Sequence, residues 1–99
     1  MKSSFNELVS SHPLVLVDFF ATWCGPCKAL APILSEVKAD LGDSIKIVKI
    51  DVDQHPKLAA AQQVRGVPTM VLFKNGKAVW RQSGLLQKSA IIQTVNQHS

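Results

Sequence analysis

The stretch that decides the fold is residues 14–27, LVLVDFFATWCGPC. Residues 14–21 are apolar except for Asp18, and such a run is typical of a central parallel strand that is buried on both faces. Two cysteines, Cys24 and Cys27, follow this run directly. After them, apolar residues recur at helical spacing as far as Gly42, the residue type that commonly ends a helix. The stretch therefore predicts a buried strand whose carboxyl end delivers two thiols to the N-terminus of a helix.

The segments on either side of this stretch complete an α/β fold. Residues 45–51 (IKIVKID) form a second β-rich run, and the order strand, helix, strand implies a right-handed parallel crossover. Asn75-Gly76 is a strong signal for a tight hairpin, here between antiparallel strands over 69–73 and 77–82. Three further helices are predicted: a first one with a capping box of Ser4 and Glu7, a short one over 57–63, and a last one over 86–95. We therefore expect a mixed sheet covered by helices.

Length and composition restrict the class of protein. The chain has 99 residues, of which 46% are hydrophobic and 18% charged, so it is expected to fold as one globular domain over residues 1–99. No window approaches the roughly 18 consecutive apolar residues that a membrane span needs. The first twelve residues, MKSSFNELVSSH, contain no apolar signal core. We therefore expect a cytoplasmic protein that does not associate with membranes.

Charge is distributed unevenly along the chain. Residues 1–53 contain five lysines and seven acids, a net charge of −2, whereas residues 54–99 contain six basic residues and no acid. The basic residues are scattered, which is usual for a solvated surface. Motifs of the common nucleic-acid-binding folds are absent and the chain has no tyrosine, so a nucleic-acid partner is not expected. The asymmetry leaves an acidic protein partner as a possibility.

The spacing of Cys24 and Cys27 restricts their chemistry. Unpaired N–H groups and the macrodipole at a helix N-terminus favour negative charge, so Cys24 is expected to form a nucleophilic thiolate at lower pH than a free cysteine. A purely structural disulfide would restrict the unfolded chain by only about 2 kcal/mol in so small a loop. A zinc site would need further ligands, yet no second cysteine pair exists and the three histidines lack metal-ligand spacing. A redox role is therefore favoured, and no metal is expected.

The chain resembles the thioredoxin family in several segments that occur in the family's order. These are Trp23-Cys24-Gly25-Pro26-Cys27 after the apolar strand, Lys49 in IVKIDVD, Gly66-Val67-Pro68-Thr69, the FKNGK hairpin and Gly84. The resemblance covers residues 5–97. It implies a three-layer α/β/α fold with a central mixed sheet of four to five strands flanked by about four helices.

The resemblance also implies roles for the residues of the motif. Cys24 would attack a substrate disulfide and Cys27 would resolve the mixed disulfide, while Gly25-Pro26 between them is similar to the reducing members of the family. Asp18 would accept the proton of Cys27, because burial raises the pKa of a carboxyl group toward neutrality. Lys49, on the neighbouring strand, would tune the pKa of Asp18.

A docking surface for substrates is implied as well. Pro68 would be in the cis form and would place Val67 opposite Cys24, with the backbone of Val67 free to pair with an extended substrate segment. The other residues that the resemblance assigns to this surface are Trp23, Gly66, Gly84 and Leu85.

Three features depart from the family's pattern. The N-terminal residues leave room for a helix but hardly for the extra strand with which thioredoxins usually begin, so residues 45–51 are expected to form a sheet edge. Lys46 and Lys49 would protect that edge from pairing with other chains. Phe20 stands where many relatives have tryptophan, and Gln87 stands where a helix-capping serine is common.

The function implied is that of a monomeric protein-disulfide reductase, a redox carrier that binds no cofactor and is recharged from NADPH by a flavin-dependent thioredoxin reductase. Two alternatives stay open. An oxidase or isomerase is one, although such relatives commonly have histidine where this chain has Pro26. A non-catalytic partner subunit or binding module is the other, and the basic second half could support it.

The charge asymmetry generates a prediction about salt. Turnover with an acidic protein disulfide is expected to slow as ionic strength rises, because screening weakens the attraction to the basic second half. A neutral small disulfide serves as the control, and its turnover should change little. Equal salt responses of the two substrates would remove the preference for acidic partners.

Overall fold

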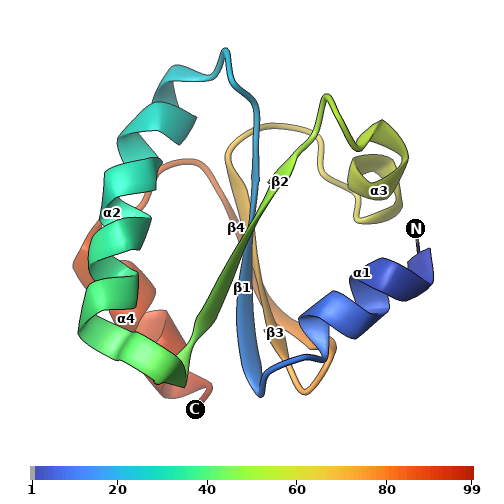
Figure 1. The fold of residues 1–99 in the computed structure, drawn as a ribbon. Helices are drawn as coiled ribbons and strands as arrows, with labels where there is room; N and C mark the ends of the chain where they lie inside the picture. Colours follow the sequence, from blue (N-terminus) through green and yellow to red (C-terminus); the bar gives the residue numbers. More distant parts are fainter. Residues whose placement is uncertain (1) are drawn as a thin grey trace.

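A four-stranded mixed sheet separates two pairs of helices (Figure 1). The computed structural model describes residues 2–99. In chain order the elements are α1 (Lys2–Val9), β1 (Leu14–Phe20), α2 (Gly25–Leu41), the short 3-10 helix η1 (Gly42–Ser44), β2 (Lys46–Asp51), α3 (Pro56–Ala61), β3 (Thr69–Lys74), β4 (Lys77–Ser83) and α4 (Lys88–Gln97). No helix in residues 2–99 is long and apolar enough to cross a membrane. The three-layer α/β/α architecture expected from the sequence is confirmed.

Strand β1 lies inside the sheet and determines its topology. The strand order is β2-β1-β3-β4, with β1 parallel to β2 and antiparallel to β3. The register places Asp18 of β1 beside Lys49 of β2 and Met70 of β3. Strand β2 forms one edge of the sheet, as the short N-terminal region predicted.

Alternate side chains of β1 enter two separate hydrophobic cores. Leu14 and Leu16 pack in the core beneath α2 and α4, and Val15, Val17 and Phe19 pack in the core beneath α1 and α3. Each fully buried large aliphatic side chain contributes roughly 1.5–3 kcal/mol relative to an exposed one. Burial on both faces explains why this strand is apolar throughout its length except at Asp18.

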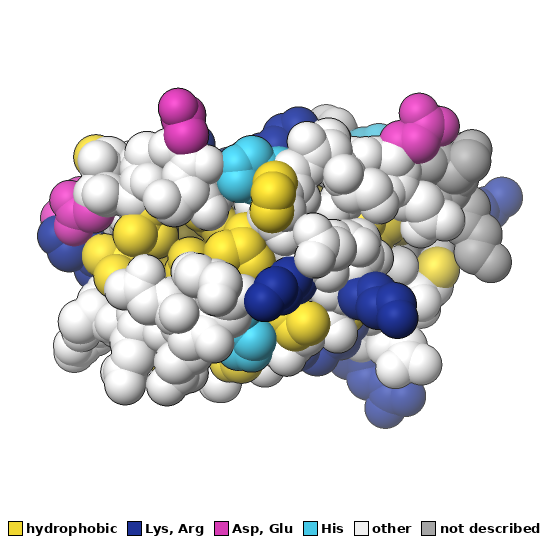
Figure 2. All heavy atoms as spheres, turned by 90° about the horizontal axis from the view of Figure 1, so that it is seen from below, with side chains coloured by type: hydrophobic (Ala, Val, Ile, Leu, Met, Phe, Trp, Pro, Cys, Tyr) yellow, Lys and Arg dark blue, Asp and Glu magenta, His cyan; other side chains and the backbone are white. Residues whose placement is uncertain are grey.

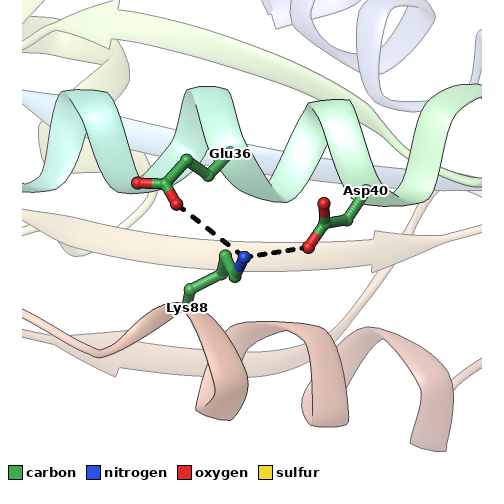
Figure 3. A network of polar contacts seen from close by, with 3 residues as sticks. All are labelled: Glu36, Asp40 and Lys88. Carbon is green, nitrogen blue, oxygen red and sulfur yellow. Dashed lines mark ion pairs between the residues drawn. The ribbon is translucent and has the colours of Figure 1, made fainter.

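An ion-pair cluster joins the two helices on one face (Figure 3). The Nζ atom of Lys88, at the start of α4, lies 3.0 Å from Asp40 and 3.7 Å from Glu36 on α2. The hydrogen bond to Asp40 and the negative charges raise the pKa of Lys88. Gln87 occupies the N-cap of α4 but forms no side-chain capping bond. The two acids of α2 therefore offset the positive charge of Lys88, which is unfavourable at a helix N-terminus.

The end of the sheet at which β1 begins is closed by polar contacts. His12 donates from Nε2 to the carbonyl of Asp43 (2.7 Å) and accepts at Nδ1 from the backbone N–H of Leu14 (3.1 Å). Seen from this end, histidine and basic side chains lie beside exposed hydrophobic ones (Figure 2). His12 thus ties the start of β1 to the turn after α2.

One predicted helix start was wrong, and two were displaced by one or two residues. Helix α1 already includes Lys2, so Ser4 lies inside it and cannot be the N-cap of a capping box. Helix α4 starts at Lys88, two residues after the predicted start near Leu86, and Leu86 packs against the core from the segment before the helix. Helix α3 starts at Pro56, since proline at the first helical position loses no hydrogen bond.

The predicted hairpin is confirmed and depends on its glycine. Asn75 (φ 51°) and Gly76 (φ 84°) form the two-residue turn between β3 and β4. A Cβ atom at Gly76 would lie 2.6 Å from the Ser10 hydroxyl. The turn therefore packs against Ser10, just after α1, and a Cβ atom at position 76 would require the Ser10 hydroxyl to move.

Gly76→Ala is expected to lower the free energy of unfolding by about 1–2 kcal/mol or more, from left-handed backbone strain together with the clash. Chemical denaturation measures this. Ser10→Ala, made alone and together with Gly76→Ala, is the matched control, because it removes the hydroxyl that the new Cβ atom would meet. A smaller loss for Gly76→Ala in the Ser10→Ala background is expected, and equal losses in the two backgrounds would mean that the contact with Ser10 is unimportant.

Candidate active site

The two cysteines form a disulfide at the N-terminus of α2. Cys24 is the N-cap residue, and its Sγ accepts the backbone N–H of Cys27 at 3.1 Å. Gly25 and Pro26 fill the first two helical positions, where the missing N–H of proline is not needed. The Cα atoms of Cys24 and Cys27 are 5.2 Å apart, and both residues are buried except for a few per cent of their surface.

Electrostatics at this helix end favour a thiolate once the disulfide is reduced. The first turn of α2 contains no acidic residue that would repel negative charge. The N–H groups of the first turn point toward Cys24, and one of them already contacts its sulfur. The sequence-predicted location of Cys24 at a helix N-terminus is thus present in the structure.

Asp18 is a buried carboxyl group on β1. Its side chain has no exposed surface, and neither carboxyl oxygen has a hydrogen-bond partner among the described residues. Burial raises its pKa from 3.8 to about 6, and the positive charge of Lys49 opposes part of that rise. Because side chains alternate along a strand, Asp18 faces the same side as Leu16, which is the side covered by α2. A carboxyl group with this pKa can exchange a proton near neutral pH.

Lys49 is positioned on β2 to act on Asp18. The two residues are register partners on adjacent parallel strands, so their side chains share one face of the sheet. The Nζ atom of Lys49 lies 5.0 Å from the centre of the Phe20 ring, within range of a cation–π contact. Lys49 therefore contacts an aromatic neighbour and acts on Asp18 through its charge, without a hydrogen bond to the carboxyl group.

A second group of predicted residues lies close to the disulfide. The Val67–Pro68 peptide bond is cis, and Val67 packs against the small cluster formed by Ala21, Cys24 and Cys27. The carbonyl of Pro68 accepts the backbone N–H of Gly84 at 2.9 Å. The structure thus brings the loop before β3 and the end of β4 together beside the cysteines.

Trp23 is 69% exposed, the largest exposure among the hydrophobic side chains of this surface. Its Nε1 donates to Oδ2 of Asp53 at 2.8 Å, and the backbone N–H of Asp53 donates to Asp51. Sequence reasoning did not select Asp53. Its position just after β2, at the same end of the sheet as the cysteines, is the signal that could have indicated it.

A groove of about 170 Å³ adjoins the disulfide. Its lining combines the predicted Trp23, Gly66 and Val67 with three residues that the sequence analysis did not select, Val52, Val64 and Arg65. Leu85, after Gly84, is 48% exposed and is not among the residues that line the groove. Within residues 2–99, no group of three His, Cys, Asp or Glu side chains could hold a metal ion. The site therefore offers a disulfide beside an apolar groove with one cationic residue.

Comparison with known proteins gives consistent matches. The thioredoxin family model, described as "Thioredoxin", matches residues 1–97. A thioredoxin of Chlamydia caviae is 46% identical over 97% of this chain and 92% of its own length. The chloroplastic thioredoxin Y of rice is 48% identical over 94% of this chain, which spans only 56% of that protein. Among solved structures, a mutant thioredoxin from Halobacterium salinarum has a TM-score of 0.88 and 38% identity, covering 97% of this chain and 83% of the other.

One relative joins two activities in its name. The bifunctional thioredoxin reductase/thioredoxin of Mycobacterium leprae is 43% identical over 95% of this chain, which corresponds to 20% of that protein.

Asp18→Asn is expected to stabilise the oxidised protein at pH 7.5 and to have less effect at pH 4.5. The folded state raises the pKa of Asp18 to about 6, so it binds this proton more tightly than the unfolded chain does. The free energy of unfolding of the wild type therefore falls as pH rises from about 4 to above 6, by an amount on the order of 3 kcal/mol for full ionisation.

Thermal unfolding of both proteins at the two pH values measures this difference. The exposed carboxylates titrate equally in both proteins, so their contribution to the pH dependence of stability cancels in the comparison. A difference between the two proteins that does not change with pH would contradict ionisation of Asp18 in the folded state.

Proposed function

This chain belongs to the thioredoxin family and is a thiol-disulfide oxidoreductase that reduces protein disulfides, and we propose that Cys24 is its attacking thiol and Cys27 its resolving thiol. The observation that carries the assignment is the position of the pair. Cys24 is the N-cap of α2 and accepts an N–H bond at its sulfur, whereas Cys27 is the third residue of the helix and donates that N–H. Negative charge is therefore better stabilised on Cys24 than on Cys27.

The reaction proceeds in two exchanges. The Cys24 thiolate attacks one sulfur of the substrate disulfide, whose S–S bond breaks, and the first substrate thiolate leaves. Cys27 then attacks the Cys24 sulfur in the mixed disulfide, forms the Cys24–Cys27 bond and releases the second substrate thiolate. Both leaving thiolates take up protons, and two electrons pass from the dithiol to the substrate.

Asp18 is proposed to accept the proton of Cys27, and Lys49 to adjust the pKa of Asp18. Cys27 must lose its proton before it can attack, and a carboxylate of raised pKa beneath α2 is a suitable acceptor. The charge of Lys49 keeps the pKa of Asp18 from rising further, so that Asp18 stays largely ionised at neutral pH.

The groove is proposed to bind the segment that carries the substrate disulfide. Trp23 and Val67 offer apolar surface on two sides of the cysteines, and Gly66 leaves the backbone open to a close approach. The free backbone groups of Val67 would pair with an extended substrate segment. Gly84 and Leu85 extend this surface toward α4.

Partners and location complete the proposal. Thioredoxin reductase is the proposed source of electrons, supplied in turn by NADPH, and the fused relative from Mycobacterium leprae supports this pairing. A cytoplasmic location is proposed because a reducing compartment keeps such a pair in the dithiol form. We also propose that the protein acts as a monomer on disulfide proteins, acidic ones preferentially.

Cysteine variants test the roles of the two thiols. Cys24→Ser is expected to reduce turnover of a protein disulfide to background, because a serine hydroxyl does not ionise near neutral pH. Cys27→Ser should instead accumulate a mixed disulfide with the substrate, visible by non-reducing electrophoresis and mass spectrometry. A partner subunit or binding module would keep its activity in both variants, which would contradict catalysis by the pair.

The reduction potential of the Cys24/Cys27 couple tests the direction of the reaction. Equilibration with defined dithiothreitol buffers is expected to give a value of about −270 mV, the established value for thioredoxin. A value near about −120 mV would make the protein an oxidant instead.

A further inference from the structure

The loop over residues 62–68 forms one wall of the active-site groove. It connects α3 to β3 and carries Val64, Arg65, Gly66 and Val67, all of which line the groove. The backbone position of this loop therefore sets the distance between the groove wall and the disulfide. The contacts that hold the loop come mainly from β4, which has no residue in the groove.

The loop begins in a backbone conformation that its residue does not favour. The N–H groups of Gln63 and Val64 donate to Ala60 (3.0 Å) and Ala59 (2.9 Å), the two bonds of a Schellman motif that ends α3. The residue that makes this turn is Gln63, with φ of 58°. Glycine is the usual residue there, because a side chain makes the left-handed region unfavourable. The turn at Gln63 therefore needs support from outside the helix.

Arg81 of β4 supplies that support. Its guanidinium donates from one nitrogen to the carbonyl of Gln63 (3.1 Å) and from the other to the carbonyl of Gln62. These carbonyls lie at the end of α3, where carbonyl groups lack helical partners and attract positive charge. Arg81 pairs with Val71 in the sheet, and Val71 packs in the core beneath α1 and α3. Arg81 therefore lies on the α3 side and spans both carbonyls with one planar group.

The other end of the loop is also attached to β4. The hydroxyl of Thr69 donates to the carbonyl of Gly66 at 2.7 Å and lies 3.1 Å from the hydroxyl of Ser83. The N–H of Gly84, just after β4, donates to the carbonyl of Pro68. Only the turn at Gln63 depends on a single long side chain.

We propose that Arg81 is a positioning residue for substrate docking. By holding the carbonyls of Gln62 and Gln63, it keeps the strained turn in place and thereby fixes the groove wall from Val64 to Val67. Arg81 does not contact the cysteines, so its effect is on binding of the substrate segment and not on thiol exchange. This inference rests on the proposed function of the groove.

Three variants distinguish the effect of the two hydrogen bonds of Arg81 from simple electrostatic attraction of the substrate. Arg81→Lys keeps the charge but cannot span two carbonyls with a planar group, whereas Arg81→Gln loses both. Lys77→Gln removes one charge from the same strand at an exposed residue and is the matched control. Each protein is assayed with a protein disulfide and with a small aromatic disulfide, and the reduction potential and thermal stability are measured.

Both Arg81 variants are expected to raise KM for the protein disulfide by about three- to tenfold with little change in kcat. The rate with the small disulfide and the reduction potential should not change. Amide hydrogen exchange at Val64, whose N–H closes the turn, should become about tenfold faster in both variants. Gly at position 63 removes the backbone strain. Adding Gln63→Gly to either Arg81 variant should therefore restore slow exchange at Val64 and return KM most of the way to its wild-type value.

Other outcomes would overturn the proposal. An effect of Lys77→Gln equal to that of Arg81→Gln, with Arg81→Lys unaffected, would assign the effect to charge alone. Equal losses of activity with both disulfide substrates, or unchanged hydrogen exchange at Val64, would also contradict the positioning role of Arg81. Hydrogen exchange is measured without any enzymatic assay, so it tests the hydrogen bonds of Arg81 separately from the proposed function.

Discussion

The burial of β1 on both of its faces is the constraint on which the rest of the structure depends. This strand separates two hydrophobic cores, pairs with strands on both sides and ends just before the cysteines. Because every side chain of the strand must fill one core or the other, Asp18 is surrounded by packing atoms and not by water. The strand that stabilises the fold therefore also raises the pKa of the carboxyl group beneath the reactive helix.

Local sequence patterns predicted most of the fold and the reactive pair. The apolar run over 14–21, the Asn75-Gly76 turn and the cysteine pair each depend on neighbouring residues, so their structures can be read from short segments. The contacts of Asp53 with Trp23 and of Arg81 with Gln63 join residues that are far apart in the sequence. No periodicity indicates such contacts. They follow only from the order of the strands and the direction in which each side chain points.

Reactivity and recognition are built from different parts of the chain. The groups proposed to act on sulfur and its proton lie on β1, at the N-terminus of α2 and at Lys49 of β2. The groove proposed to bind the substrate comes from Trp23, Val52 and residues 64–67, and Arg81 of β4 holds the start of the loop that carries 64–67. The two sets meet where Val52 and Val67 pack against Cys24 and Cys27, and at Trp23, which lines the groove and precedes Cys24.

This separation along the chain has a consequence during protein synthesis. A ribosome releases the chain from its N-terminus, so Cys24 and Cys27 emerge well before Gly66, Val67 and the strands that hold them. Until β3 joins β1, the strand before the cysteines lacks its antiparallel partner and the groove does not exist. A nascent chain thus exposes its two thiols before the groove beside them has formed.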